Sequence, residues 1–227
     1  MTTTTRPLSP TARSTVRRGT KRARGDRQDL YEVLDTALIC HLGVIVGGHP
    51  LVLPTAFGYD LDGPDDGGSL YVHGSVASRS IREAPDHDIC VSLTVLDGLV
   101  LARSAFHHSM NYRSAVVIGR GRLVTDDAER SRALALVVDH VVPGRSATLR
   151  PHTRKELAAT SVVAIPLVEA SVKIRSGDPV DEDFDVEAGG WSGVLPLRMA
   201  AGSPQTATDA SGEPVPAHVK ARRAALA

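Results

Sequence analysis

The chain has 227 residues, 42% of them hydrophobic, so it is long enough to bury a full core, and one principal domain is expected. Its 26 basic residues balance its 26 acidic residues, so there is no global field that would favour nucleic acid or a membrane surface. No segment reaches the roughly 18 apolar residues that cross a bilayer, and no secretory hydrophobic region lies near Met1, so we expect a cytoplasmic protein.

The charge is unevenly distributed along the chain. Residues 6–27 carry eight Arg or Lys and one acid, whereas residues 178–187 carry six acids and no base. The basic arm could contact nucleic acid or act as an organellar transit peptide, but its polar composition favours a solvated, disordered arm. We therefore expect residues 1–24 and 201–227 to be disordered and dispensable, with a single domain over residues 25–200.

The first expected elements are a helix and a β-hairpin. Apolar residues recur at helical spacing in residues 27–38, which predicts an amphipathic helix. Residues 39–46 and 51–59 are rich in strand-forming residues, and Gly47 and Gly48 between them are typical of a tight hairpin turn. The Gly-, Asp- and Pro-rich residues 62–68 predict a loop.

Short strands continue through the middle of the chain. Four are expected there, at residues 69–72, 89–96, 99–102 and 112–124. A helical turn is expected at residues 77–84, and Pro85 ends it.

Two helices and a strand follow. Asp126 with Glu129 resembles a capping box that opens a long helix. A second, short helix is expected over residues 153–159, and a strand over residues 162–174 with an irregularity at Pro166. Strands at short, regular spacing with few helices favour an antiparallel α+β barrel over a parallel doubly wound sheet.

Two polar segments interrupt the apolar pattern. Within residues 99–124, histidine, serine, asparagine, tyrosine and arginine crowd together between two strands. Burying them is costly unless a bound anion or a polar cofactor satisfies them. In residues 70–82, an apolar strand is followed by a glycine and then by Ser78 and Arg79 at the start of a helical turn. Hydroxyls, an Arg fork and the N–H groups of a helix start are what a phosphate needs.

Together with the helix at 27–38, the strand at 51–59 and the closing segment WSGVLPL, these segments resemble the flavin-nucleotide-binding branch of the pyridoxamine 5′-phosphate oxidase-like family. That branch includes the nitroimidazole-resistance-type proteins. The resemblance runs from about Asp26 to Met199. It implies an α+β split β-barrel, antiparallel with Greek-key connections and a few peripheral helices. It also implies a homodimer that binds FMN at the subunit interface, so residues 25–200 would be an FMN-binding domain.

The resemblance assigns roles to particular residues. In the family, the turn equivalent to Ser78 and Arg79 holds the FMN phosphate, and the strand equivalent to Thr55 and Ala56 contacts the edge of the isoalloxazine. The full set of cofactor-binding residues that we expect is Thr55, Ala56, His73, Gly74, Ser75, Ser78, Arg79, Asn111, Tyr112, Arg113, Ser114 and Trp191.

Two of these assignments have plainer alternatives. Ser78 could be an ordinary N-cap beside a surface arginine at position 79, since serine caps are common. Trp191, the only tryptophan, could stack on the flavin or close the pocket across the dimer, or it could be a buried anchor for the C-terminal segment.

The polar run at residues 111–114 opens a strand. Alternation places Asn111 and Arg113 on one face and Tyr112 and Ser114 on the other. One face could approach a flavin or its phosphate while the other packs. The alternative is that Arg113 forms a cross-strand salt bridge.

Nine histidines invite a metal or haem hypothesis, because some split-barrel relatives bind haem. We expect no metal site, since no histidine has the spacing of a zinc motif. His73 precedes Gly74 on a strand that faces the proposed site, so it is the best single candidate for a ligand or a catalytic proton donor; a satisfied structural histidine is the alternative. Cys40 and Cys90 lie in apolar runs and are expected to be buried free thiols.

The sequence has no Ser-His-Asp order, nucleophile elbow or Walker loop, so a bound flavin would carry any chemistry. We therefore expect a flavin-dependent oxidoreductase that acts on an unidentified small molecule, in the manner of a nitroreductase or an oxidase. The alternatives are a non-catalytic flavin-binding or sensing module and a haem-binding split-barrel protein, and a deazaflavin is a less favoured cofactor. Pyridoxamine 5′-phosphate oxidase activity itself is not expected, because the closing segment offers only Arg198 for a substrate phosphate.

Overall fold

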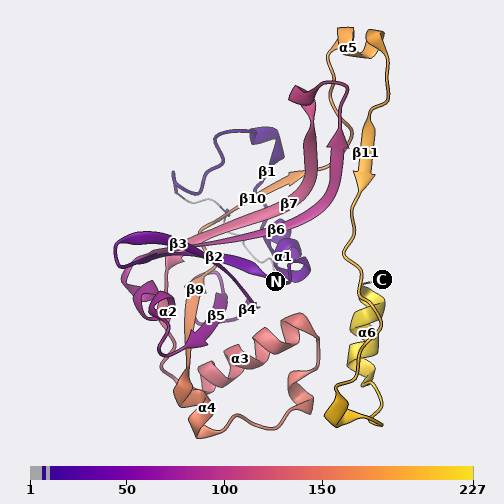
Figure 1. The fold of residues 1–227 in the computed structure, drawn as a ribbon. Helices are drawn as coiled ribbons and strands as arrows, with labels where there is room; N and C mark the ends of the chain where they lie inside the picture. The colour runs from indigo at the N-terminus through magenta and orange to yellow at the C-terminus, as the bar shows by residue number, and fades with distance from the viewer. Residues whose placement is uncertain (1–6, 9–10, 227) are drawn as a thin grey trace, which may run out of the picture. The chain divides into compact units, whose positions relative to one another are not determined.

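The computed structural model describes residues 7–8 and 11–226, and these form two compact units (Figure 1). Unit 1 contains the described residues up to Ala37 together with Val91–Ile118 and Val168–Arg198. Unit 2 contains Leu38–Cys90, Gly119–Leu167 and the described residues from Met199 onward.

An antiparallel sheet forms the centre of unit 1. Its strands follow the order β1-β10-β7-β6, and β11 pairs with β6. The bounds are Ala23–Arg24 for β1, Asp88–Leu101 for β6, Ser109–Arg120 for β7, Ala170–Arg175 for β10 and Gly193–Pro196 for β11. The strands predicted at residues 89–96 and 99–102 are thus one long strand, because Gly98 continues the ladder opposite Pro196 instead of ending it.

Helix α1 (Arg27–Thr36) packs against β10. Asp26 caps its start, since the aspartate side chain accepts a hydrogen bond of 2.9 Å from the N–H of Gln28. The leucine and valine side chains on one face of the helix are fully buried. This confirms the amphipathic helix predicted over residues 27–38, which ends two residues early.

The described part of the N-terminal arm is tied to β10 and to the glutamate that precedes it. Glu169 accepts two hydrogen bonds of 2.9 Å from Arg13 and another from the Thr11 hydroxyl, and the bonds from Arg13 lower the pKa of Glu169 to about 2. The N–H of Ala170 donates to the carbonyl of Leu8 at 2.6 Å, and the Leu8 side chain is fully buried. These contacts differ from the free arm that composition predicts, because a buried leucine and a two-bond ion pair offset the entropy of ordering the chain.

Unit 2 begins with the hairpin of β2 (Cys40–Val46) and β3 (His49–Thr55), which pair antiparallel along their whole length. Gly47 and Gly48 form the turn with φ values of 56° and 81°. Residues with a side chain rarely adopt such angles, so the pair of glycines confirms the predicted hairpin turn. Helix α2 (Arg79–Glu83) packs against β2.

A four-stranded antiparallel sheet forms the rest of the framework of unit 2, in the order β4-β5-β9-β8. Its strands are β4 (Phe57–Asp60), β5 (Ser69–Ser75), β8 (Arg122–Leu123) and β9 (Thr160–Pro166). The apolar side chains of β5 and β9 are almost entirely buried, so these two central strands carry the core of the unit.

Two strands predicted from the sequence are each divided in the structure. The run at residues 112–124 becomes β7 and β8, which break at Gly121, where a Cβ atom would collide with a neighbouring isoleucine. The run at residues 162–174 becomes β9 and β10, and β9 ends at Pro166, where the irregularity was predicted. The apolar pattern continues across both breaks, so hydrophobicity alone does not mark them.

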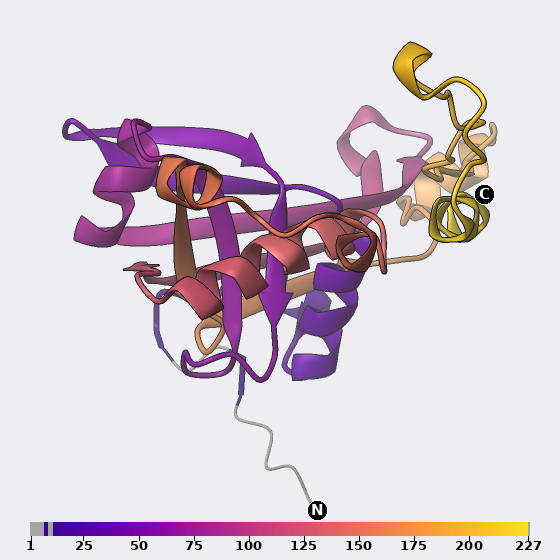
Figure 2. The ribbon, with the colours of Figure 1, turned by 90° about the horizontal axis from the view of Figure 1, so that it is seen from below.

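Helix α3 (Asp127–Val141) covers one face of the sheet of unit 2, as Figures 1 and 2 both show. It lies closest to β4. A Cβ atom at Gly58 would lie 2.7 Å from the backbone nitrogen of Val137, so only glycine permits this approach of helix to strand.

Side-chain caps start the two helices that the sequence predicts after residue 125. Asp126 accepts a hydrogen bond of 2.8 Å from the N–H of Glu129. The Glu129 carboxylate accepts from Arg122 instead of from the backbone of Asp126, so the two residues do not form a reciprocal capping box. A reciprocal capping box, formed by Thr153 and Glu156, opens α4 (Arg154–Ala159).

Several short elements complete the two units. The 3-10 helices are η1 (Thr20–Arg22) and η3 (Ala105–His107) in unit 1, and η2 (Ala84–Asp86), η4 (Ser146–Thr148) and η5 (Thr208–Ala210) in unit 2. Two helices that the sequence analysis did not anticipate are α5 (Asp183–Ala188) in unit 1 and α6 (Ala217–Ala225) in unit 2. Instead of a featureless tail, α6 has strong helix formers throughout, and Arg222 donates a hydrogen bond of 2.8 Å to the carbonyl of Val141. None of the described helices has both the length and the apolar character to cross a membrane.

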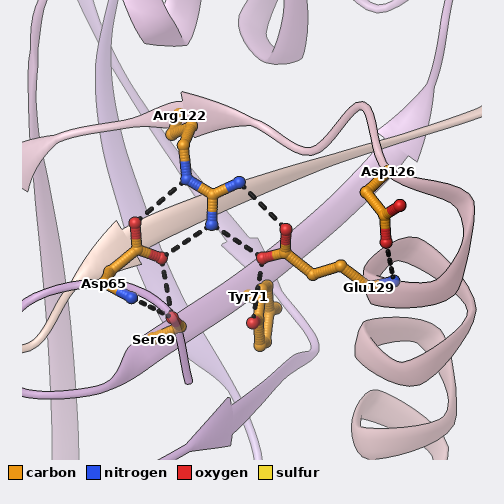
Figure 3. Close-up of polar contacts among 6 residues, drawn as sticks. All are labelled: Asp65, Ser69, Tyr71, Arg122, Asp126 and Glu129. Carbon is orange, nitrogen blue, oxygen red and sulfur yellow. Dashed lines mark hydrogen bonds and ion pairs between the residues drawn. The ribbon is translucent and has the colours of Figure 1, made fainter.

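A charged network links three segments of unit 2 (Figure 3). Arg122 on β8 donates two hydrogen bonds of 3.0 Å to Asp65 and two of 2.7 and 3.0 Å to Glu129 on α3. The Tyr71 hydroxyl donates to Glu129 at 3.1 Å, and the Ser69 hydroxyl donates to Asp65 at 2.6 Å. The side chains of Asp65 and Glu129 are only 11% and 17% exposed, so both carboxylates depend on Arg122 to balance their charge.

Arg122→Met should destabilise the protein by about 2–4 kcal/mol, because it leaves two poorly hydrated carboxylates unpaired. Burial raises the pKa of Asp65, but hydrogen bonds from Arg122 and Ser69 lower it further, so the folded-state value lies below the usual range. The stability gained from this shift is present above the unfolded pKa of about 3.9 and is lost as the pH falls through the folded-state value. Urea unfolding at pH 7 and near pH 3 checks this: the deficit of the variant should shrink in acid. Arg150→Met, which breaks an ion pair with Glu156 that water screens, is the control and should lower the stability much less than Arg122→Met at either pH.

Candidate functional site

The residues predicted to bind a cofactor fall into two groups. The group in unit 2 is Thr55, Ala56, His73, Gly74, Ser75, Ser78 and Arg79. The group in unit 1 is Asn111, Tyr112, Arg113, Ser114 and Trp191. Within unit 2, most of the group gathers at the connection from β5 to α2; within unit 1, four members open β7.

The connection from β5 to α2 is a tight, self-bonded turn. A Cβ atom at Gly74 would lie 2.8 Å from Cγ1 of Ile81, so glycine lets α2 pack directly on the strand. The Ser75 hydroxyl accepts from the N–H of Ala77 at 3.2 Å, and the Ser75 carbonyl accepts from the N–H of Ser78 at 2.9 Å. Gly74 and Ser75 therefore build the turn that presents the start of α2.

Ser78 and Arg79 already have partners. The hydroxyls of Ser78 and Ser80 lie 2.8 Å apart, and Ser78 occupies the N-cap position of α2 without a capping bond from its side chain. Arg79 donates to Glu83 at 3.0 Å, one helical turn along, and Glu83 also accepts from the N–H of Gly47 at 2.7 Å. The bonds from Gly47 and then Arg79 lower the pKa of Glu83. A phosphate at this turn must therefore compete with a carboxylate for Arg79, whose side chain is 65% exposed.

His73 is a half-buried residue of β5, opposite Val162 on β9. Its Nδ1 atom is buried and makes no hydrogen bond with any residue that the structure describes. Burial lowers the pKa of His73, so the imidazole is neutral at pH 7. An unsatisfied buried nitrogen costs free energy, and a ligand atom or a proton acceptor placed here would remove that cost.

Thr55 and Ala56 lie where one strand ends and the next begins. Thr55 is the last residue of β3, and Ala56 separates β3 from β4, so the predicted strand over residues 51–59 is interrupted here. Both residues are half-buried, and the Thr55 hydroxyl donates to the Ala56 carbonyl at 3.2 Å. An interrupted ladder leaves backbone groups for the polar edge of a ring, as expected for this position.

Asn111 and Arg113, on one face of β7, are both occupied by neighbours in unit 1. Asn111 donates to the carbonyl of Gly177 at 3.1 Å and accepts from Arg175. Arg113 donates bonds of 2.9 and 3.0 Å to Asp97 on β6, and these bonds raise the pKa of Arg113. The salt-bridge alternative for Arg113 is therefore the arrangement in the structure.

Tyr112 and Ser114 lie on the opposite face of β7. The register places Tyr112 opposite Arg175 and Ser114 opposite Lys173 on β10. Directly opposed residues of antiparallel strands project to the same face, so two hydroxyls share this face with two cations. Hydroxyl donors beside positive charge are the composition that a phosphate requires.

Trp191 is 71% exposed, so the alternative of a buried anchor is wrong for this chain. Arg103 fixes the segment around it, donating to the Gly190 carbonyl at 3.0 Å, to the Ser192 hydroxyl at 2.8 Å and to Asp181 at 2.8 Å. The sequence analysis missed Arg103. The six acids at residues 178–187 were the available signal, because so many carboxylates require a nearby cation.

The remaining candidates for reactive groups are possible metal ligands and the two cysteines. Among the described residues, no three His, Cys, Asp or Glu side chains are placed to hold a metal ion. Cys40 and Cys90 are free, and burial raises the pKa of Cys40 to about 12. Cys90 is exposed, not buried as predicted, because it alternates with the buried Ile89 and Val91 on β6.

Comparison with known proteins identifies the family. A family model described as pyridoxamine 5′-phosphate oxidase matches residues 26–174. The chain belongs to this family. The antiparallel sheets with few helices and this membership confirm the α+β split β-barrel class predicted from the sequence. A search of curated proteins finds no match.

Several solved structures are similar to this chain, among them the following three. The flavocytochrome Anf3 from Azotobacter vinelandii is 35% identical, with 95% of this chain and 98% of that chain covered and a TM-score of 0.86. The FAD and heme binding protein from Mycobacterium smegmatis is 40% identical, with 88% and 97% covered and a TM-score of 0.80. A protein described as a 5-nitroimidazole antibiotic resistance protein from Bacteroides thetaiotaomicron is 21% identical, with 67% and 86% covered and a TM-score of 0.55, which supports the fold alone.

Arg79→Ala should weaken the binding of a flavin nucleotide by about 1.5–3 kcal/mol and leave riboflavin unaffected, if Arg79 holds the phosphate as the resemblance implies. Glu83→Gln is the matched variant. Removing the competing carboxylate should strengthen nucleotide binding only slightly, because water already screens this exposed ion pair. Fluorescence titrations with FMN, FAD and riboflavin measure both effects. Equal losses for nucleotide and riboflavin would make Arg79 a structural residue.

Proposed function

We propose that this protein binds a flavin nucleotide and haem and transfers electrons between them and a small molecule. One observation carries the proposal. Two proteins of 35% and 40% identity, each matched over almost its whole length, are described as a flavocytochrome and as an FAD and heme binding protein. Close identity over a full chain favours a shared set of cofactors, although the activity belongs to the site rather than to the fold.

The flavin that we propose is FAD. The sequence analysis predicted FMN, and both molecules share the isoalloxazine ring and a phosphate on the ribityl chain. FAD is favoured because the Mycobacterium smegmatis relative is described with it. When bound, the flavin supplies hydride or single-electron transfer and the haem supplies single-electron transfer. The chain would contribute ring contacts at Thr55 and Ala56 and phosphate contacts at Ser78 and Arg79.

His73 fits the haem part of the proposal. An imidazole must be neutral to bind iron, and the low pKa of His73 keeps it neutral at pH 7. Its buried Nδ1 has no partner within the described residues, so the ring is free to be engaged by a ligand. His73 would therefore hold the haem iron, in preference to acting as a flavin-side proton donor.

A visible spectrum of the purified protein tests both cofactors. We expect a Soret band together with flavin absorption, and acid extraction should release FAD and not FMN. His73→Ala should lose the Soret band while keeping the flavin. His49→Ala, at an exposed histidine of β3, is the control and should keep both. Flavin absorption without haem in the wild-type protein would favour the simple flavoprotein, and no flavin at all would overturn the proposal.

A homodimer is the assembly that we propose. Unit 1 exposes Phe106, Phe184 and Trp191 at 90%, 69% and 71%, and such large aromatic side chains on a surface mark an interaction site. Because the resemblance implies two-fold pairing, a second copy of the chain is the partner we expect.

Light scattering should give twice the chain mass of 24.0 kDa at micromolar concentration. The double variant Phe106→Ser/Trp191→Ser should shift the protein towards the monomer, because it removes two apolar anchors from the interface. Val52→Ser, which removes a 62% exposed apolar side chain from unit 2, is the control and should remain dimeric. A wild-type mass of 24.0 kDa would contradict the dimer.

A further inference from the structure

Unit 1 contains a pocket that the predicted site does not include. It has a volume of about 620 Å³, within the usual range for small-molecule sites. Its lining consists of Arg18, Gly19, Thr20, Lys21, Arg22 and Lys173. We call it the basic pocket, since four of these six residues are cations. The first five residues come from the N-terminal arm and the last from β10, so two distant parts of the sequence build it.

The charge of the basic pocket is not balanced by the protein. The charged side chains of Arg18, Lys21, Arg22 and Lys173 make no hydrogen bond or ion pair with any residue in the described part of the chain, and only backbone groups of Arg22 and Lys173 are bonded. This sets them apart from Arg79 and the other paired arginines of the predicted site. Four cations held close together repel one another, and this repulsion is relieved only by an anion or by water and counterions.

The strand register extends the positive face beyond the pocket itself. Lys173 lies opposite Ala23 of β1 on one side and opposite Ser114 of β7 on the other. Arg175, two residues further along β10, projects to the same face and lies opposite Tyr112. The hydroxyls of Ser114 and Tyr112 therefore border the cations of the basic pocket.

Arg175 gives independent evidence that positive charges lie close together beside the basic pocket. Its guanidinium donates to the side-chain oxygen of Asn111 and to the backbone carbonyls of Gly177 and Asp178, the latter two at 3.2 and 3.1 Å, and not to a carboxylate. Burial and then the nearby charge of Arg22 lower the pKa of Arg175. A bound anion would reverse this unfavourable interaction.

We propose that the basic pocket binds the diphosphate of a dinucleotide. A diphosphate spreads two negative charges over two phosphate groups, which matches cations that come from both the arm and β10. The inference rests on the proposed redox function, which supplies two dinucleotides with this chemistry: the flavin itself and a nicotinamide-type electron donor. It also gives the basic arm a role in binding, in contrast to the dispensable arm expected from composition.

The test is a triple variant of the full chain, Lys21→Ala/Arg22→Ala/Lys173→Ala. The matched control, Arg154→Ala/Lys155→Ala/Arg223→Ala, removes the same charge from exposed positions on α4 and α6. Titration calorimetry of flavin-free protein with inorganic pyrophosphate measures the affinity of the basic pocket for a diphosphate, and this measurement does not depend on redox activity. We expect the triple variant to lose at least about 100-fold in pyrophosphate affinity, since each charge-assisted hydrogen bond contributes roughly tenfold or more, and the control to lose less than about threefold.

Titrations with FAD, riboflavin and NADPH then distinguish the two sources. If NADPH weakens alone, the diphosphate is that of the donor. If FAD weakens while riboflavin and NADPH do not, the diphosphate is that of the flavin, and the assignment of the flavin phosphate to Ser78 and Arg79 is then wrong. Unchanged pyrophosphate affinity in the triple variant, equal loss in the control, or tighter binding of a DNA duplex than of pyrophosphate would each overturn the proposal. A wild-type chain that binds pyrophosphate and NADPH but no flavin would contradict the proposed cofactor and leave the basic pocket standing.

Discussion

The hydrogen bonds from Arg122 to Asp65 and Glu129 hold together three segments of unit 2 that are separate in the sequence. A loop and the start of α3 each bring a largely buried carboxylate close to the core residue Tyr71 or its neighbour Ser69, and a short strand brings the partly exposed guanidinium that binds both. None of these charges could be buried alone, because the loss of hydration would exceed what a single hydrogen bond returns. The position of α3 on the sheet, and the glycine contact that lets it approach β4, are therefore coupled to one guanidinium group.

Periodicity predicted most of the framework, because hydrophobic burial decides which residues form strands and helices. The helix over residues 27–38, the hairpin at Gly47 and Gly48 and the helix after Asp126 are all present. The breaks at Gly121 and after Pro166 were harder to see, since they arise from close packing and from the absence of an N–H group and not from polarity. The helix α6 was missed because it has no long apolar face, and its helix-forming composition was the only available signal.

The sequence predicted where the candidate site residues gather, but it did not predict which of their charged side chains form ion pairs within the protein. Polar residues do gather at the start of α2 and at the start of β7, as the sequence indicated. The sequence could not decide whether Arg79 and Arg113 would be free, although Glu83 at a spacing of four residues already offered a partner for Arg79. Three of the four cations that line the basic pocket lie in the arm instead, where their charge density was visible but where no apolar pattern suggested a fixed position.

The turn between β2 and β3 has a consequence for Arg79. Gly47 donates its N–H to Glu83, and a Cβ atom there would lie 3.0 Å from a terminal nitrogen of Arg79. A side chain at position 47 would thus meet the guanidinium, in addition to requiring a positive φ. The exposed end of the arginine can shift to make room, so the positive φ is the larger barrier to a side chain at position 47. The shape of the hairpin therefore depends on its glycine, and the glycine N–H in turn orients the carboxylate that holds Arg79.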